Sequence, residues 1–203
     1  MNPRVLRHFI KIAGITTFVM FSIWAVTQMY LNELPGDFYT REGDIRLSEG
    51  SHEEAMKSFN RALREMPNHR GALMGRALVY LQTKRHDEAI AEFTHLIAYL
   101  KKTMDLKDAT GLGALAAAYA NRGIVHDRTG KYEKALADYI KALETDQGVL
   151  SGPGLVDKII YGTPKPSTVR SRAIYLKKQL ALPESERLLR APQIDEKQRM
   201  HKP

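Results

Sequence analysis

The chain has 203 residues, enough for one domain of ordinary size and an additional segment. It contains no cysteine, which excludes disulfide bonds, thiolate metal sites and cysteine nucleophiles. The net charge of +8 is uneven, because residues 1–32 carry +3, residues 33–149 carry −1 and residues 150–203 carry +6. A neutral middle does not suit a nucleic-acid-binding domain, and we expect no nucleic-acid partner.

The first segment with a clear pattern is residues 12–31, which contain 20 consecutive residues without a charge. A helix of that length is about 30 Å long, the thickness of the hydrocarbon core of a bilayer. Arg4, Arg7 and Lys11 precede it, and positive charge stays on the cytoplasmic side. We therefore expect a transmembrane anchor at 12–31 that contacts the lipid bilayer, with residues 1–11 in the cytoplasm.

Two other interpretations of this segment are open. A cleaved signal peptide has a shorter apolar region, usually 7–15 residues, and a clear cleavage site, which this sequence lacks. A buried helix of a soluble protein is the second alternative. The anchor is preferred, and with the basic amino terminus it predicts a single-pass protein of a bacterial inner membrane whose body faces the periplasm.

Three similar stretches follow the anchor, at residues 50–67, 84–101 and 130–147. Each is preceded by a second helical pattern, so each unit is expected to contain two helices joined by a turn. The positions that match between units are Tyr39, Leu73 and Tyr119; Gly43, Ala77 and Gly123; Ala55, Ala89 and Ala135; and Phe59, Phe93 and Tyr139.

On these residues the chain resembles the tetratricopeptide repeat (TPR) family, whose units of about 34 residues stack into a helical solenoid. The resemblance covers residues 36–149 and implies units at about 36–69, 70–103 and 116–149. An insertion near residues 104–115 implies either longer flanking helices or a protruding loop. The expected fold is therefore all-α, with an N-terminal transmembrane helix, a three-repeat solenoid, a C-terminal capping helix and an extended tail.

The units also depart from the family pattern. Lys84 stands where the other units have the turn glycines Gly50 and Gly130. Glu42 and Arg46 replace apolar residues that are common in the family, which predicts weaker packing in the first unit. A terminal repeat is expected to be atypical.

Residues 150–203 form a basic segment beyond the repeats. Residues 154–162 are expected to make a short helix, and residues 188–203, which lack a sustained pattern, an extended docking arm. Anionic lipid head groups are a further candidate partner for this segment. A capping helix at 169–182 is predicted by an apolar stripe, which consists of Val169, Ala173, Leu176 and Leu180.

The sequence contains none of the common catalytic or phosphate-binding motifs. His52 and His86 occupy packing positions after the turns, and no carboxylate cluster accompanies them, which argues against metal ligation. Gly111 and Gly113 resemble part of a dinucleotide fingerprint, but no apolar strand precedes them. We therefore expect no catalytic residue, no metal and no cofactor, and the protein is not expected to be an enzyme.

The resemblance implies instead a concave groove, lined by the first helix of each pair, that binds peptide segments of a partner. The implied positions lack cations, which disfavours capture of a C-terminal carboxylate and favours an apolar helix or extended segment. The alternative is that this surface packs on the chain's own tail or on a neighbouring subunit. The implied groove residues are Thr40, Asp44, Leu47, Met74, Gly75, Leu78, Ala117, Ala120, Asn121 and Ile124.

The preferred functional hypothesis is a membrane-anchored TPR scaffold or assembly factor that faces the periplasm and binds a membrane protein or a membrane-proximal client. The alternative is a stable, non-catalytic accessory subunit of a large inner-membrane complex. A third class, an organelle import receptor, would place the repeats in the cytosol.

Overall fold

The computed structural model describes residues 3–31, 33–105, 107–145 and 169–190. These residues form α-helices and one short 3-10 helix, with no strand among them. The all-α class expected from the sequence is confirmed. The helices are α1 (Pro3–Leu31), α2 (Asp37–Ser48), α3 (His52–Glu65), α4 (Arg70–Gln82), α5 (His86–Thr103), α6 (Ala109–Arg128), α7 (Tyr132–Thr145) and α9 (Val169–Leu180), and the 3-10 helix is Glu184–Glu186.

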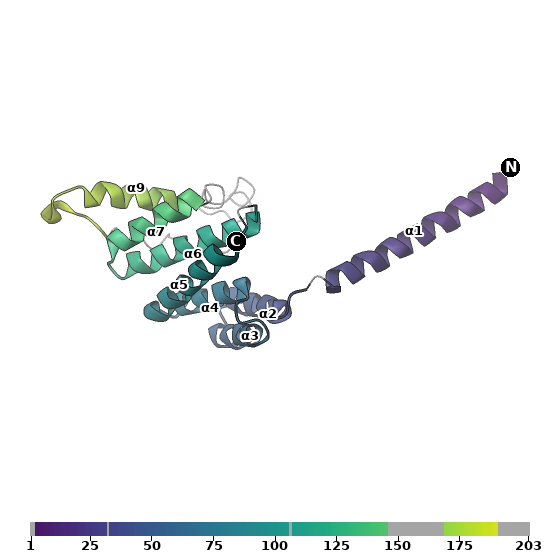
Figure 1. Ribbon diagram of the computed structural model, residues 1–203, viewed down its shortest axis with the longest axis horizontal. Coiled ribbons are helices and arrows are strands. Elements are labelled where there is room, and N and C mark those ends of the chain that lie inside the picture. The colour runs from purple at the N-terminus through teal and green to yellow at the C-terminus, as the bar shows by residue number, and fades with distance from the viewer. Residues whose placement is uncertain (1–2, 32, 106, 146–168, 191–203) are drawn as a thin grey trace.

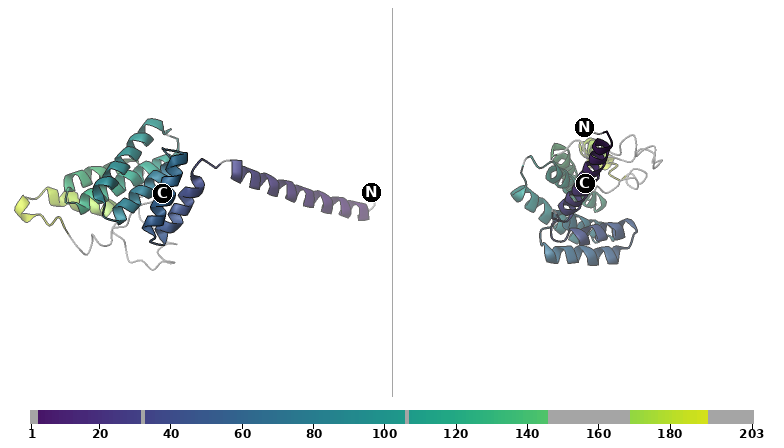
Figure 2. Two further views of the ribbon diagram at one scale, coloured as in Figure 1. Left: turned by 90° about the horizontal axis from the view of Figure 1, so that it is seen from below. Right: turned by 90° about the vertical axis from the view of Figure 1, so that its right-hand side faces the viewer.

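Helices α2 to α7 form three helical hairpins that stack into a solenoid (Figure 1). Each helix packs on its hairpin partner and on the next hairpin, and α9 packs on α7 at the far end. Helix α1 leaves the first hairpin as a separate rod, as two further views confirm (Figure 2). The expected order of a long N-terminal helix, repeats and a terminal helix is therefore present.

Close packing between the hairpins depends on glycine at defined places. The ring of Phe59 in α3 lies between Gly43 of α2 and Gly75 of α4. A methyl carbon placed on Gly43 would be 2.6 Å from ring atom Cε1, and one on Gly75 would be 2.3 Å from Cζ. In the third hairpin a carbon on Gly123 would be 2.7 Å from the ring of Tyr139. A side chain at any of these three glycine positions would clash with the buried aromatic ring, so the close packing requires glycine there.

Polar bridges join the two helices of the second and third hairpins. Arg122 donates to both carboxylate oxygens of Asp138, at 2.8 and 2.7 Å. Arg76 donates from two nitrogens, Nε and Nη2, to the single oxygen Oε1 of Glu92, at 2.9 and 2.7 Å. Such paired, partly buried guanidinium–carboxylate contacts fix the register of one helix on the other.

In the first hairpin, a hydroxyl group takes the place of the arginine as the donor to the carboxylate. Glu42 accepts a hydrogen bond of 2.9 Å from the hydroxyl of Ser58 across the hairpin. Arg46 is exposed and pairs with Glu49 on the helix surface. Glu42 therefore joins the two helices, and the packing deficit expected at this position is offset by a hydrogen bond.

The turns inside the three hairpins share a left-handed backbone conformation. The φ angle is 77° at Gly50, 76° at Gly130 and 61° at Lys84. This conformation is easily adopted by glycine, whereas a side chain costs about 1–2 kcal/mol there. The middle turn keeps the geometry of the other two although it lacks their glycine.

Replacement of Lys84 by glycine is therefore expected to stabilise the protein by about 1 kcal/mol. Urea denaturation of the full-length chain in detergent would measure this gain. Lys57→Gly, in the exposed middle of α3, is the control and should destabilise by about 1 kcal/mol. A loss of stability in Lys84→Gly would show that the left-handed turn carries no strain.

The insertion between the second and third units lengthens two helices. Helix α5 has 18 residues, four more than α3, and α6 has 20 residues, seven more than α4. Of the two alternatives that the sequence left open, longer flanking helices are correct. The added turns extend the neighbouring helices α5 and α6 beyond the other helices of the solenoid.

Helix α9 covers the open face of the last hairpin. Val169, Ala173 and Leu176 are buried, and Leu180 is half-buried. The chain then folds back along α9, where the backbone N–H of Leu188 donates to Gln179 Oε1 at 2.7 Å. The beginning of the expected docking arm thus lies against the terminal helix. Residues 191–203, and the short helix expected at 154–162, lie outside the described residues.

A buried ion pair fastens α9 to the repeats. Arg172 is 1% exposed and donates two hydrogen bonds of 2.7 Å to the carboxylate of Asp127 in α6. Tyr139 of α7 donates to the same carboxylate at 3.1 Å, and Leu189 accepts from Arg172 at 3.0 Å. The carboxylate of Asp127 therefore connects α6, α7 and α9, and Arg172 adds the returning chain through the carbonyl of Leu189.

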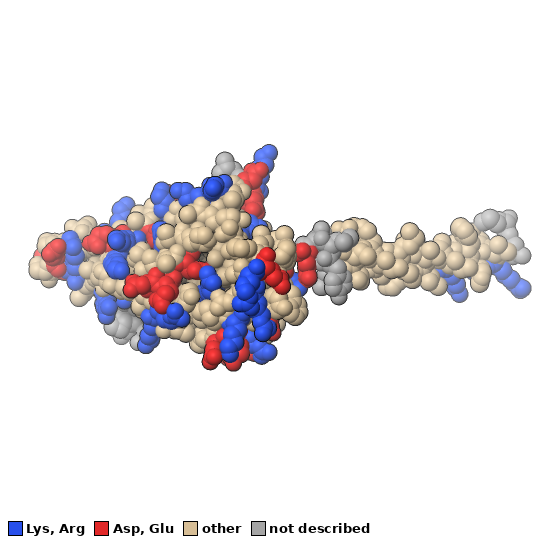
Figure 3. Space-filling model, turned by 60° about the horizontal axis from the view of Figure 1, so that its bottom comes forward, with Lys and Arg blue, Asp and Glu red and all other residues tan. Residues whose placement is uncertain are grey.

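Helix α1 exposes apolar side chains on all sides. Phe9, Ile15 and Phe18 are 68%, 65% and 71% exposed. By length and composition, residues 3–28 can cross a membrane, a wider span than the 12–31 expected. The surface of α1 carries basic residues only at its far end (Figure 3). A helix that is apolar all round needs an apolar environment.

Candidate functional site

A hollow of about 560 Å³ opens between α2, α4 and the extended ends of α5 and α6. The insertion builds one wall, because Leu100, Thr103 and Met104 come from the added turn of α5 and its exit. The opposite wall belongs to α2. The apolar part of the lining consists of Leu34, Met66, Met74, Leu100, Met104 and Ala114.

Methionine supplies three of the apolar contacts in this hollow. Met74 is buried at its base, while Met66 and Met104 are half-buried near its mouth. Methionine is unbranched and flexible, so such a surface can adapt to apolar groups of different shape. The hollow is therefore suited to an apolar side chain of a binding partner.

The charged side chains around the hollow are mainly acidic. Asp37, Asp44 and Asp108 line it together with Arg70 and His69. With histidine neutral, three carboxylates face one guanidinium, which leaves an excess of negative charge. A basic group on a ligand would be favoured at this rim.

His69 organises the wall formed by α2 and α4. Its Nδ1 accepts a hydrogen bond of 3.2 Å from the backbone N–H of Ala72 and so caps α4. The proton consequently resides on Nε2, which donates to Asp37 Oδ1 at 2.8 Å. Burial raises the pKa of Asp37, but hydrogen bonds from His69 and the backbone of Leu34 outweigh it, and the net pKa is lowered. Asp37 is therefore ionised at neutral pH.

Asp108 organises the opposite wall. It caps α6 by accepting from the backbone N–H of Gly111 at 2.8 Å, and Arg70 donates to its other oxygen at 2.7 Å. These two hydrogen bonds lower the pKa of Asp108. The contact joins the start of α4 to the start of α6, and it fixes the width of the hollow.

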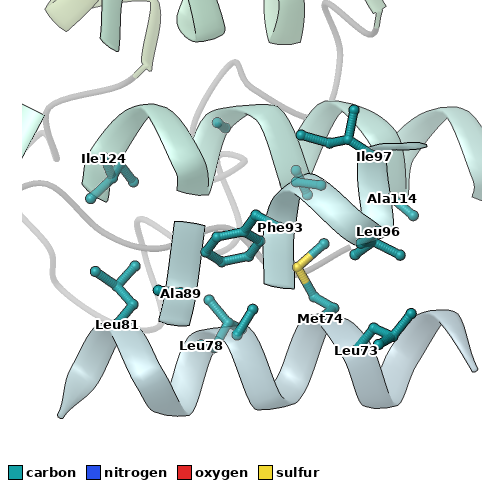
Figure 4. Packing of buried hydrophobic residues seen from close by; sticks show 14 of the residues in the cluster. Leu73, Met74, Leu78, Leu81, Ala89, Phe93, Leu96, Ile97, Ala114 and Ile124 are labelled. Atoms are coloured by element: carbon teal, nitrogen blue, oxygen red, sulfur yellow. The ribbon is translucent and has the colours of Figure 1, made fainter. Parts of the chain in front are cut away.

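Three of the ten implied groove residues line this hollow, namely Thr40, Asp44 and Met74. The other seven are buried in the chain's own core and do not line it. Leu78, for example, is 3% exposed and points from α4 toward Phe93 of α5 (Figure 4). The seven are Leu47, Gly75, Leu78, Ala117, Ala120, Asn121 and Ile124.

The physical reason is the close stacking of the first helices. Gly75 faces Phe59, and the middle of α6 is enclosed by α5, α7 and α4. Small side chains on α6 bring these helices together and leave no open channel there. A partner role for the ten residues stays a prediction, and only the three in the hollow offer surface for it.

The sequence does not single out Tyr99, Thr103 and Thr110 near the ends of α5 and α6, or the pair of Asp37 and His69. A signal was available in the helical periodicity that continues through residues 97–104. Among the described residues, no group of three or more His, Asp or Glu side chains could hold a metal ion. The expected absence of cofactor and catalysis stays a prediction.

Comparisons with known proteins agree with this architecture. Two family models described as tetratricopeptide repeat match residues 40–98 and 116–148. A solved structure described as the first TPR of Spaghetti (RPAP3) bound to HSP90 peptide SRMEEVD aligns with a TM-score of 0.53 at 16% identity. The alignment covers 73% of this chain and 94% of that chain, and at such identity it shows the fold alone. No curated protein matches the chain.

Proposed function

We propose, from the premise that this chain belongs to the tetratricopeptide repeat family, that it is a membrane-anchored scaffold or assembly factor. Its repeats form a protein–protein interaction scaffold. The observation that carries the proposal is the acidic, methionine-lined hollow in a solenoid joined to an uncovered apolar helix. The partner is a membrane protein or a client close to the membrane.

The anchor is supported by the exposure of apolar side chains around α1. Because Arg4, Arg7 and Lys11 resist translocation, we place the amino terminus in the cytoplasm and the repeats in the periplasm of a bacterial inner membrane. Alkaline phosphatase fused after Pro203 should then be active in cells. An inactive phosphatase fusion together with a fluorescent cytoplasmic reporter at the same site would reverse this orientation.

The hollow is proposed to bind a partner segment that presents an apolar side chain beside a basic group. The methionines provide the apolar contact, and the ionised carboxylates of Asp37 and Asp108 favour the cation. The solved relative binds the peptide SRMEEVD, which carries three acidic residues. The carboxylates of this hollow would repel such a peptide, so we propose a ligand of opposite charge.

Photo-crosslinking in native membranes tests this proposal. A photoreactive residue at Thr103, which is exposed in the hollow, should capture the partner, to be identified by mass spectrometry. Ala91 is the matched control, since it is exposed on the same helix outside the hollow. Asp44→Lys should weaken capture from Thr103. Equal capture from both positions, or capture that Asp44→Lys leaves unchanged, would contradict the assignment.

The second candidate function is a permanent accessory subunit of an inner-membrane complex. The proposed anchor supports a permanent subunit as well as it supports an assembly factor, because α1 would be able to pack among the membrane helices of the complex. Purification in mild detergent separates the two, since a subunit co-elutes with its complex in fixed ratio and a transient assembly factor does not.

A further inference from the structure

The outer face of α2 exposes apolar side chains at the edge of the solenoid nearest the anchor. Phe38 and Ile45 are 63% and 58% exposed and lie two turns apart on one helix face. Arg41 lies between them, with 55% of its side chain exposed. We refer to these three residues as the edge stripe. Helix α2 packs with its other side on α3 and α4.

The connection between α1 and α2 is bonded to the solenoid. The backbone N–H of Leu34 donates to Asp37 Oδ2 at 2.8 Å, and that of Asp37 returns to the carbonyl of Leu34 at 3.0 Å. Glu33 forms an ion pair with Arg41 of the edge stripe. One residue, Asn32, separates this bonded turn from the end of α1 at Leu31.

Gly36 fixes the same turn on the next helix. Its φ angle is 87°, and a methyl carbon placed on it would lie 2.8 Å from the carbonyl oxygen of Ala62 in α3. The backbone at Gly36, where the chain enters α2, therefore packs directly on the backbone of α3 at Ala62. The solenoid cannot swing on a long flexible linker, and its first edge stays close to the end of α1.

Chain length sets how far the edge stripe can be from the membrane. Phe38 follows Leu31 by seven residues, so their Cα atoms are at most about 25 Å apart even in an extended chain. The hydrogen-bonded turn shortens this reach. If α1 spans the bilayer, the edge stripe lies at the depth of the head groups or just above it.

We infer that the edge stripe rests in the lipid interface, so that α2 is a second membrane contact beside the span; this inference depends on the proposed anchor. Aromatic and aliphatic side chains with a neighbouring arginine suit this region, because the apolar groups leave water while the guanidinium stays among the head groups. The occupant is lipid rather than a protein, because the stripe continues directly from the helix that the bilayer would cover. The contact would hold the solenoid in one orientation and set the direction in which its hollow faces.

Single cysteines test this contact cleanly, because the natural chain has none. The full-length protein would carry Phe38→Cys or Ile45→Cys, labelled with a nitrobenzoxadiazole fluorophore. Each would be reconstituted in phosphatidylcholine–phosphatidylglycerol vesicles, with and without lipids brominated near the head groups. Ile174→Cys on α9 is the matched aqueous control, since Ile174 is an aliphatic residue 52% exposed at the far end of the solenoid. Ile15→Cys reports whether α1 is inserted.

The expected result is that brominated lipid quenches the labels at residues 15, 38 and 45, while iodide in the buffer quenches the label at 174 far more than these three. If the label at 15 is quenched by lipid but those at 38 and 45 respond to iodide as 174 does, the interfacial contact is refuted and the anchor stands. If the label at 15 is also open to iodide, both the anchor and the contact are overturned.

Discussion

Arg172→Met is expected to lower the free energy of unfolding by about 3–5 kcal/mol. Asp127 is only 6% exposed, and without Arg172 it loses two hydrogen bonds of 2.7 Å and the opposite charge that permits its burial. The hydroxyl of Tyr139 would remain as one neutral donor. Urea denaturation of the full-length chain in detergent, followed by circular dichroism, measures the change.

Two further variants show whether the buried charge is the cause. Arg170→Met removes an exposed arginine from the same helix and should change stability by less than about 0.5 kcal/mol. The double variant Arg172→Met with Asp127→Asn removes both charges, and it should recover part of the loss. If Arg172→Met is as stable as Arg170→Met, the ion pair does not fasten α9 to the repeats.

The helical hairpins could be predicted because their constraints are local in sequence. Two helices can approach closely only where small residues face a large ring, so Gly43 and Phe59 recur in equivalent form as Gly123 and Tyr139. The left-handed turn is equally local, and it is kept even where Lys84 replaces glycine. The long apolar helix α1 and the apolar stripe of α9 follow from length and periodicity alone.

The hollow could not be predicted, because it depends on contacts between distant residues. His69 and Asp37 are 32 residues apart, and Arg70 and Asp108 are 38 apart. The insertion was identified, but sequence alone did not decide between a loop and longer helices. The lengthened ends of α5 and α6 make one wall of the hollow.

The groove implied by the family resemblance shows a second reason why sequence alone does not locate a binding surface. Family alignment assigns positions along each first helix, but the rotation of that helix against its neighbours decides which positions are open. Met74 and Leu78 are four residues apart on α4; the first lines the hollow, and the second lies under Phe93 (Figure 4). One helical turn thus separates the lining of the hollow from the core of the solenoid.

Leu78→Glu is therefore expected to unfold much of the solenoid. The family resemblance implies that Leu78 lies in the groove; at such a surface, a charge would disturb binding and spare the fold. In the structure it is 3% exposed among Leu81, Ala89 and Phe93, where an unpaired carboxylate has no water and no cation. The loss should exceed about 4 kcal/mol at neutral pH, and circular dichroism should show reduced helix content.

Two substitutions at the same position separate charge from shape. Leu78→Met keeps the volume and apolar character and should cost less than about 1.5 kcal/mol. Leu78→Gln carries no charge, so the stability that it loses relative to the natural chain should be the same at pH 5 and at pH 8. Leu78→Glu should be less unstable at the lower pH, because burial raises the pKa of a carboxyl group and a neutral side chain is easier to bury. A Leu78→Glu protein that keeps its helix content and melting temperature at neutral pH would instead place this residue on the surface, and the open groove implied by the family alignment would then extend along α4 beyond Met74.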